Sequence, residues 1–102
     1  MIKPIAHRLD ITVKGIYYHF KILIRKEMED TDYIWVIYCL ELDLVTVAKN
    51  CYQAWMDMKD VVRAHIGFAM ENDNMKHCFH SAPQELWTEY FTAVRSKRKI
   101  NG

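Results

Sequence analysis

The chain is poor in the residues that mark linkers, disulfides and membrane spans. Its 102 residues include three glycines, two prolines and three cysteines. No Pro- or Gly-rich stretch divides it, so we expect a single domain. The cysteines, Cys39, Cys51 and Cys78, are far apart and form no CxxC pair, which is typical of reduced cytoplasmic thiols. No apolar run reaches the roughly 20 residues of a membrane span, and "MIKPIAHRLD" lacks the apolar core of a secretory signal.

Charge of one sign is also lacking. The formal net charge is +1, which provides no overall field to attract nucleic acid or an anionic membrane. The single basic cluster is "RSKRK", with Arg95, Lys97, Arg98 and Lys99. We predict a domain over residues 1–94 and a solvated, disordered tail over 95–102. The alternative for this tail is a salt-sensitive attraction to RNA or DNA.

What the chain does have is clear strand periodicity in its first half. Apolar and polar residues alternate over Leu9–Val13 and again over Tyr17–Arg25, as in strands with one wet face. "KG" at Lys14-Gly15 suits a tight turn or a bulge, and "EMEDTD" at Glu27–Asp32 is typical of a polar hairpin loop. "LVTVAK" predicts a further short strand.

The run from Tyr33 to Leu42 is apolar on both faces, which is typical of a central strand covered on both sides. One helix can cover one face. For the other face we expect a second copy or a partner protein, with Trp35 and Ile37 among the contacts. A homodimer is the favoured assembly, and a tetramer stays open.

The second half predicts helices. Asn50 suits an N-cap, and helical apolar spacing follows from Cys51 to Ala69 until "ENDN" ends the helix. "HCFH" suits a short strand, and "SAPQELW" begins a second helix with Ser81 as N-cap. The expected fold class is therefore α+β: a small antiparallel sheet of three to four strands packed on one long helix, plus a C-terminal helix.

Two acids, Glu41 and Asp43, follow the apolar run. On a strand, residues two apart point to the same side. They have three interpretations: the soluble end of a strand, contacts for a partner, or catalytic carboxylates. A two-metal nuclease needs several carboxylates from different elements, so the pair alone does not predict catalysis.

Metal and nucleophile chemistry find little support in the sequence. His77, Cys78 and His80 invite a zinc interpretation, but structural zinc takes four ligands and no second ligand pair lies at a suitable spacing. No base is evident beside any cysteine, and no Gly-rich loop is present to hold phosphate. We therefore predict no metal, no cofactor and no enzymatic activity.

Two segments, "YIWVIYCLELDLVTVAKNCYQAWMDMKDVV" and "ENDNMKHCFHSAPQELWTEYF", resemble the HicB-type antitoxin family. The resemblance implies a degraded ribonuclease-H-like domain without nuclease activity. It also implies a partner, the HicA-type toxin, a small ribonuclease that cleaves mRNA. Many family members carry a further C-terminal DNA-binding segment. None follows the Trp87 helix here, so we do not expect this chain alone to bind operator DNA.

The resulting functional prediction is a cytoplasmic antitoxin-type protein that occludes the RNA-binding or active face of its toxin. Glu41, Asp43, Trp35 and Ile37 are the predicted partner-binding residues. One alternative is an orphan HicB-like interaction module without a toxin. Another is a weak nucleic-acid-binding protein that uses Arg95, Lys97, Arg98 and Lys99.

Overall fold

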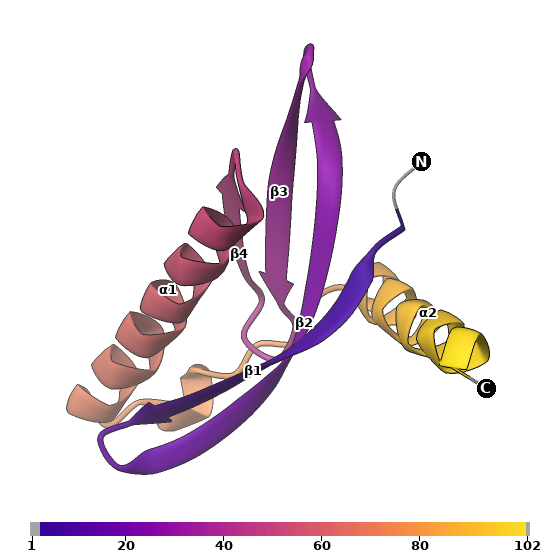
Figure 1. Ribbon diagram of the computed structural model, residues 1–102. Coiled ribbons are helices and arrows are strands. Elements are labelled where there is room, and N and C mark those ends of the chain that lie inside the picture. The colour runs from indigo at the N-terminus through magenta and orange to yellow at the C-terminus, as the bar shows by residue number, and fades with distance from the viewer. Residues whose placement is uncertain (1–2, 102) are drawn as a thin grey trace.

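Four antiparallel strands form one sheet, and the two long helices lie on opposite sides of it (Figure 1). This arrangement comes from a computed structural model, which describes residues 3–101. The strand order is β1-β2-β3-β4, so consecutive strands are neighbours throughout. The elements in chain order are β1 (Ile5–Val13), β2 (Ile16–Glu29), β3 (Asp32–Cys39), β4 (Leu44–Ala48), α1 (Cys51–Glu71), the short 3₁₀ helix η1 (Met75–His77) and α2 (Gln84–Asn101). The predicted α+β class is confirmed.

The first hairpin has the predicted tight turn. β1 pairs with β2 up to Val13 opposite Ile16, which leaves Lys14 and Gly15 as the two turn residues. Their φ values are 50° and 81°. Two positive φ values are those of a type I′ turn, whose twist matches the flanking strands, and glycine adopts them without strain.

The second hairpin has a much shorter loop than predicted. Glu27 to Asp32 was expected to be a polar loop, but β2 continues to Glu29 and pairs with β3 as far as Asp32. Only Asp30 and Thr31 turn the chain. Beside this extended ladder the Lys26 ammonium of β2 lies 4.7 Å from the ring centroid of Tyr33 of β3, a cation–π contact that supports the pairing of the two strands.

β3 ends earlier than the apolar run suggested. Its last residue is Cys39, and residues 40–43 form a turn that leads into β4. The apolar character continues because Leu40 and Leu42 of this turn are buried, with exposed fractions of 0% and 2%. The prediction that Glu41 and Asp43 lie on a strand, pointing to one side, is therefore wrong.

The main core lies between the sheet and α1. Asn50 caps α1 as predicted, since its Oδ1 accepts the backbone N–H of Gln53 at 2.7 Å. The buried stripe of α1 consists of Ala54, Met58, Val62, Ile66 and Ala69. It packs against alternate side chains of all the first three strands, with Phe20, Ile22, Ile37 and Cys39 among the buried ones.

The second face of the sheet is partly covered by the chain's own α2. Leu23, Leu40 and Ala82 form a separate buried cluster, against which Leu86, Trp87 and Tyr90 pack. α2 therefore covers part of the side for which a second copy or a partner was expected, because the linker before α2 runs beside the end of β3. A second copy or partner on the remainder of this side stays a prediction.

An ion-pair network holds α2 against β2. Both Nη1 hydrogen bonds of Arg25 go to Glu89, at 2.9 and 3.1 Å, and its Nη2 donates to the Tyr38 hydroxyl at 2.8 Å. The Glu27 carboxylate, two residues further along β2, lies 3.0 Å from Arg25 Nη2. Burial lowers the pKa of Arg25, but Tyr38, Glu89 and Glu27 outweigh it and raise the pKa overall.

The segment between the helices differs from its prediction. "HCFH" is not a strand: η1 ends at His77, and the chain then runs irregularly to Pro83. Two backbone bonds attach it to the β3–β4 turn, from His80 N–H to the Glu41 carbonyl at 3.1 Å and from Ala82 N–H to the Leu40 carbonyl at 2.8 Å. Ser81 is not bonded as an N-cap; its Oγ accepts the Trp87 indole N–H at 2.8 Å.

The basic segment is helical rather than disordered. α2 continues through Arg95 and Lys97 to Asn101, so residues 95–101 extend the helix that covers the sheet. Arg95 and Lys97 are exposed. The side chains of Arg98 and Lys99 lie outside the described residues. A helix places charges every third or fourth position on one side, which a flexible tail does not do.

Candidate partner-binding site

The carboxylate of Glu41 is used inside the fold. Its Oε1 accepts the backbone N–H of Lys21 at 2.9 Å, and Oε2 lies 3.6 Å from the Lys21 ammonium. The Leu40 N–H in turn donates to the Lys21 carbonyl at 3.1 Å. The side chain thus supplies the acceptor that β3 would have supplied had it continued. Glu41 serves the end of the β2–β3 ladder, and its predicted role as a partner contact stays a prediction.

Asp43 is more accessible. It has a φ of 52°, in the left-handed region where aspartate is enriched, and its side chain is 41% exposed. Its carboxylate lies 3.6 Å from His80 Nδ1 on the linker. The two acids therefore have different environments, and the structure does not bring them together with a third carboxylate: within the described residues there is no group of three metal-ligating side chains.

The other two predicted partner contacts lie on the α1 side of β3. Ile37 is completely buried in the main core, with an exposed fraction of 0%. It faces α1, so it presents no surface to a partner, and that prediction is corrected. Trp35 is half-buried at the edge of the same core, and the Lys26 ammonium lies 5.4 Å from its ring centroid.

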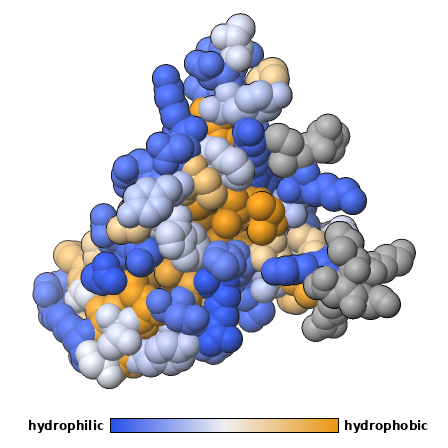
Figure 2. Space-filling model, viewed as in Figure 1, coloured by the Kyte–Doolittle hydropathy of each residue, from blue (hydrophilic) through white to orange (hydrophobic). Residues whose placement is uncertain are grey.

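The outer side of α1 carries a feature that the sequence reasoning missed. Phe68 is 67% exposed and Val61 is 38% exposed. Figure 2 shows apolar surface over the C-terminal part of α1, among polar side chains. Phe68 precedes the buried Ala69 by one residue, which places it about 100° around the helix from the buried stripe. An aromatic residue that far from the buried stripe is the signal that could have revealed this surface.

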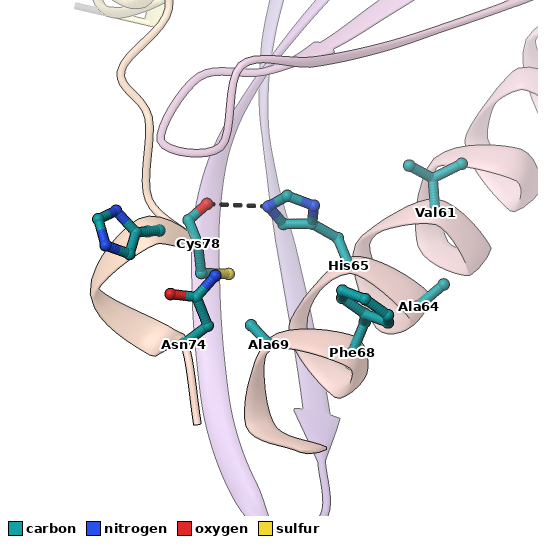
Figure 3. A pocket seen from close by; sticks show the side chains of 8 residues that line it. Val61, Ala64, His65, Phe68, Ala69, Asn74 and Cys78 are labelled. Carbon is teal, nitrogen blue, oxygen red and sulfur yellow. Dashed lines mark hydrogen bonds between the residues drawn. The ribbon is translucent and has the colours of Figure 1, made fainter. Parts of the chain in front are cut away.

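Phe68 stands between two shallow grooves. One, of about 600 Å³, lies between α1 and η1 and is lined by Val61, Ala64, His65, Phe68, Ala69, Asn74, His77 and Cys78. Figure 3 shows His65 reaching from α1 across this groove, where its Nε2 lies 2.8 Å from the Cys78 carbonyl oxygen. The other groove, of about 520 Å³, is bordered by Asp60, Arg63, Gly67 and Glu71. We call these residues around Phe68 the α1 surface.

Two carboxylates border the α1 surface. Asp60 Oδ1 lies 3.8 Å from Arg63 Nη1, and Glu71 Oε1 lies 3.2 Å from the Lys14 ammonium nitrogen. The side chains of both acids are mostly exposed, at 75% and 65%. Exposed pairs of this kind contribute little energy, so either carboxylate can exchange its cation for one on a partner.

The cysteines differ in accessibility, and this predicts their reactivity. Burial, with a contribution from the negative charge of Glu41, raises the pKa of Cys39 to about 12, and burial raises the pKa of Cys78. Cys51 is only half-buried. Iodoacetamide at mildly alkaline pH should therefore label Cys51 first, as measured by peptide mass spectrometry. Labelling of Cys39 at the rate of Cys51 in the folded chain would contradict this burial.

The same pKa shift predicts a direction for stability. An unfolded thiol ionises at about its ordinary value of 9.0, whereas folded Cys39 keeps its proton up to about 12. Within this window the unfolded state releases a proton that the folded state holds, so the Cys39 contribution lowers stability as the pH rises.

Comparison with known proteins places no relative beside this chain: no family model, no curated protein and no solved structure matches it. Over the described residues, no helix combines the length and apolar character that crossing a membrane requires.

Proposed function

We propose that this chain is a binding protein of the HicB-like antitoxin type, which neutralises a small mRNA-cleaving HicA-type toxin by occluding its RNA-binding or active face. The sequence resemblance supplies the class of partner. The observation that carries a binding role is the α1 surface, where a phenylalanine that is 67% exposed stands between two grooves. Large exposed aromatic side chains of this kind are enriched at the centres of protein interfaces.

The chemistry of the α1 surface suits such a partner. A ribonuclease that grips RNA has cations where the phosphates bind, and carboxylates can replace those phosphates. Asp60 and Glu71 lie on either side of Phe68 along the helix, so an apolar contact at the centre would be bordered by charged ones. Asp43, with its exposed carboxylate, remains a second predicted contact, as does the half-buried Trp35.

Co-expression with the product of the neighbouring reading frame tests this function. The native chain should restore growth and co-purify with the toxin. Phe68→Asp should weaken binding at least tenfold, because it removes an apolar anchor and places a charge where the partner must exclude water. The measurement is a titration of the purified toxin by calorimetry, alongside growth rescue.

Phe91→Asp is the matched control. Phe91 is 44% exposed, but it lies on α2, across the sheet from the α1 surface. The Phe91→Asp variant should bind the toxin with the same affinity as the native chain. If both variants bind equally well, the α1 surface is not the docking site. If the native chain neither rescues growth nor co-purifies with that product, the alternative of an orphan HicB-like module is favoured.

One observation favours nucleic-acid binding as the second candidate function. A groove of about 460 Å³ between β2 and α2 is lined by Lys21, Tyr90, Phe91, Val94 and Arg95. Cations beside aromatic rings are the elements with which proteins hold single strands. This function predicts salt-sensitive binding of an RNA oligonucleotide that Phe91→Asp abolishes and Phe68→Asp leaves unchanged. The two variants therefore separate the two functions.

A further inference from the structure

β4 is an edge strand without the features that usually protect sheet edges. The strand order places β1 at one edge of the sheet and β4 at the other. β1 includes the charged residues Arg8 and Asp10, whereas β4 reads LVTVA, with no charge and no proline. Val45 and Val47 are each 53% exposed. An apolar edge of this kind is a template for pairing with another strand.

The strand is held firmly by the rest of the molecule. Thr46 is 8% exposed, and its hydroxyl donates to the Ala54 carbonyl of α1 at 2.9 Å. Val45 and Val47 lie on the other face, opposite Tyr38 and Val36 of β3. Across the part of the chain that the structure describes, no strand pairs with the outer edge of β4. β4 therefore offers a pre-formed edge that pays little ordering entropy on pairing.

The sequence around β4 is complementary to a second copy of itself running in the opposite direction. In an antiparallel pair with Thr46 opposite Thr46 of a second copy, Val45 lies opposite Val47 and Leu44 opposite Ala48. Asp43 lies in the turn just before the strand and Lys49 in the bend just after it, so in this register the two residues flank the pair at each end, Asp43 of one copy near Lys49 of the other. Lys49 is exposed and forms no ion pair with the residues that the structure describes, and Asp43 is 41% exposed. Apolar residues thus meet apolar residues and opposite charges meet at both ends.

We propose that β4 pairs with β4 of a second copy of this chain, antiparallel about a two-fold axis through Thr46. The two four-stranded sheets then form one continuous sheet. The two-fold axis is perpendicular to the sheet, so both α1 helices lie on one face and both α2 helices on the other. The four valines gather on the α2 face, where directly opposed side chains are in contact.

A second copy fits this edge better than an unrelated extended peptide does. The complementarity extends over all five positions of β4, opposite charges flank the strand at its two ends, and a two-fold pair satisfies both features twice. The assembly also closes, because each copy uses its one unprotected edge and the charged β1 edge is left free. The proposal does not depend on the antitoxin function, since it is argued from β4 and the α1 surface lies outside this interface; among the predicted toxin contacts, Asp43 alone is shared.

Sedimentation velocity of the full-length chain over a range of concentrations tests the proposal. The native chain should form a dimer as concentration rises. Val45→Lys should weaken dimerisation at least tenfold, because it places a cation beside Val47 of the second copy. Ile16→Lys is the matched control: Ile16 is 52% exposed on β2 and should leave dimerisation unchanged. Circular dichroism melting checks that each variant is folded.

A charge exchange tests the register. Asp43→Lys places a lysine near Lys49 of the second copy, and Lys49→Asp places an aspartate near Asp43 of the second copy. Either substitution alone should therefore weaken the dimer by repulsion of like charges. The double variant restores opposite charges and should recover the native dissociation constant. A lysine is compatible with the backbone at position 43, because Lys14 of the same chain has a φ of 50°.

Three outcomes would overturn the proposal. The native chain could remain monomeric at the highest concentration reached. A dimer could form that Val45→Lys does not weaken, which would place the interface elsewhere. The single charge variants could weaken the dimer without rescue by the double variant, which would exclude the register centred on Thr46.

Discussion

Ile37→Ala should lower the free energy of unfolding by about 3 to 4 kcal/mol, the cost typical of removing a large buried aliphatic side chain. Ile37 has an exposed fraction of 0% and lies in the core between β3 and α1. The substitution leaves a cavity that α1 cannot readily close, because the Thr46 hydroxyl ties β4 to the Ala54 carbonyl of this helix. Urea denaturation followed by circular dichroism measures the change.

Ile16→Ala provides the control for this prediction. It removes the same atoms from a residue that is 52% exposed on β2, so its effect should stay within about 0.5 kcal/mol. If Ile37→Ala proves equally mild while it weakens binding to another protein, Ile37 would be a partner contact after all. The two variants thus decide between the role that the sequence suggested and the one that the fold assigns.

Ending the chain after Pro83 should be more damaging still. This truncation removes α2 and uncovers Leu23 and Leu40, both with an exposed fraction of 0% in the folded chain. Uncovering two fully buried leucines costs on the order of 5 kcal/mol, a large part of the stability of a domain of this size. We expect the truncated chain to unfold or self-associate, with increased binding of a hydrophobic dye.

A shorter truncation after Val94 is its matched control. It removes the basic segment but keeps Leu86, Trp87 and Tyr90, the residues that pack on the sheet. Its urea midpoint should lie close to that of the full chain. If instead the chain ending at Pro83 were as stable and as monomeric as the full chain, α2 would not be the cover of the second face.

The local features of this fold could be predicted because local physics determines them. The Lys14-Gly15 turn follows from the backbone freedom of glycine, and the Asn50 cap follows from free amides at a helix start. The α1 stripe follows from the helical period. Each involves residues a few positions apart, so the amino-acid pattern alone contains the information.

The wrong predictions concern where strands end and which groups polar side chains bond to, and both depend on residues far apart in the chain. Glu27 to Glu29 remain in β2 because their backbone pairs with residues 32–34 of β3. β3 ends at Cys39 because Glu41 satisfies the Lys21 amide, from which it is separated by 20 positions in the chain. Ser81 bonds to the Trp87 indole rather than to the helix start. The Glu41 carboxylate and the Ser81 hydroxyl could each have formed a different hydrogen bond. The residues that folding brought beside them, Lys21 and Trp87, determined which bond formed.

By itself, the sequence of this chain determined most of the segments that become strands and helices, since periodicity and capping act over a few residues; "HCFH" and residues 95–101 are the exceptions. It also left the middle strand apolar on both sides. Only the tertiary structure decided that α2 shields one of those sides, that Ile37 is core and that Phe68, Val45 and Val47 remain outside. Burial depends on which surfaces meet in space, and a one-dimensional pattern cannot show that.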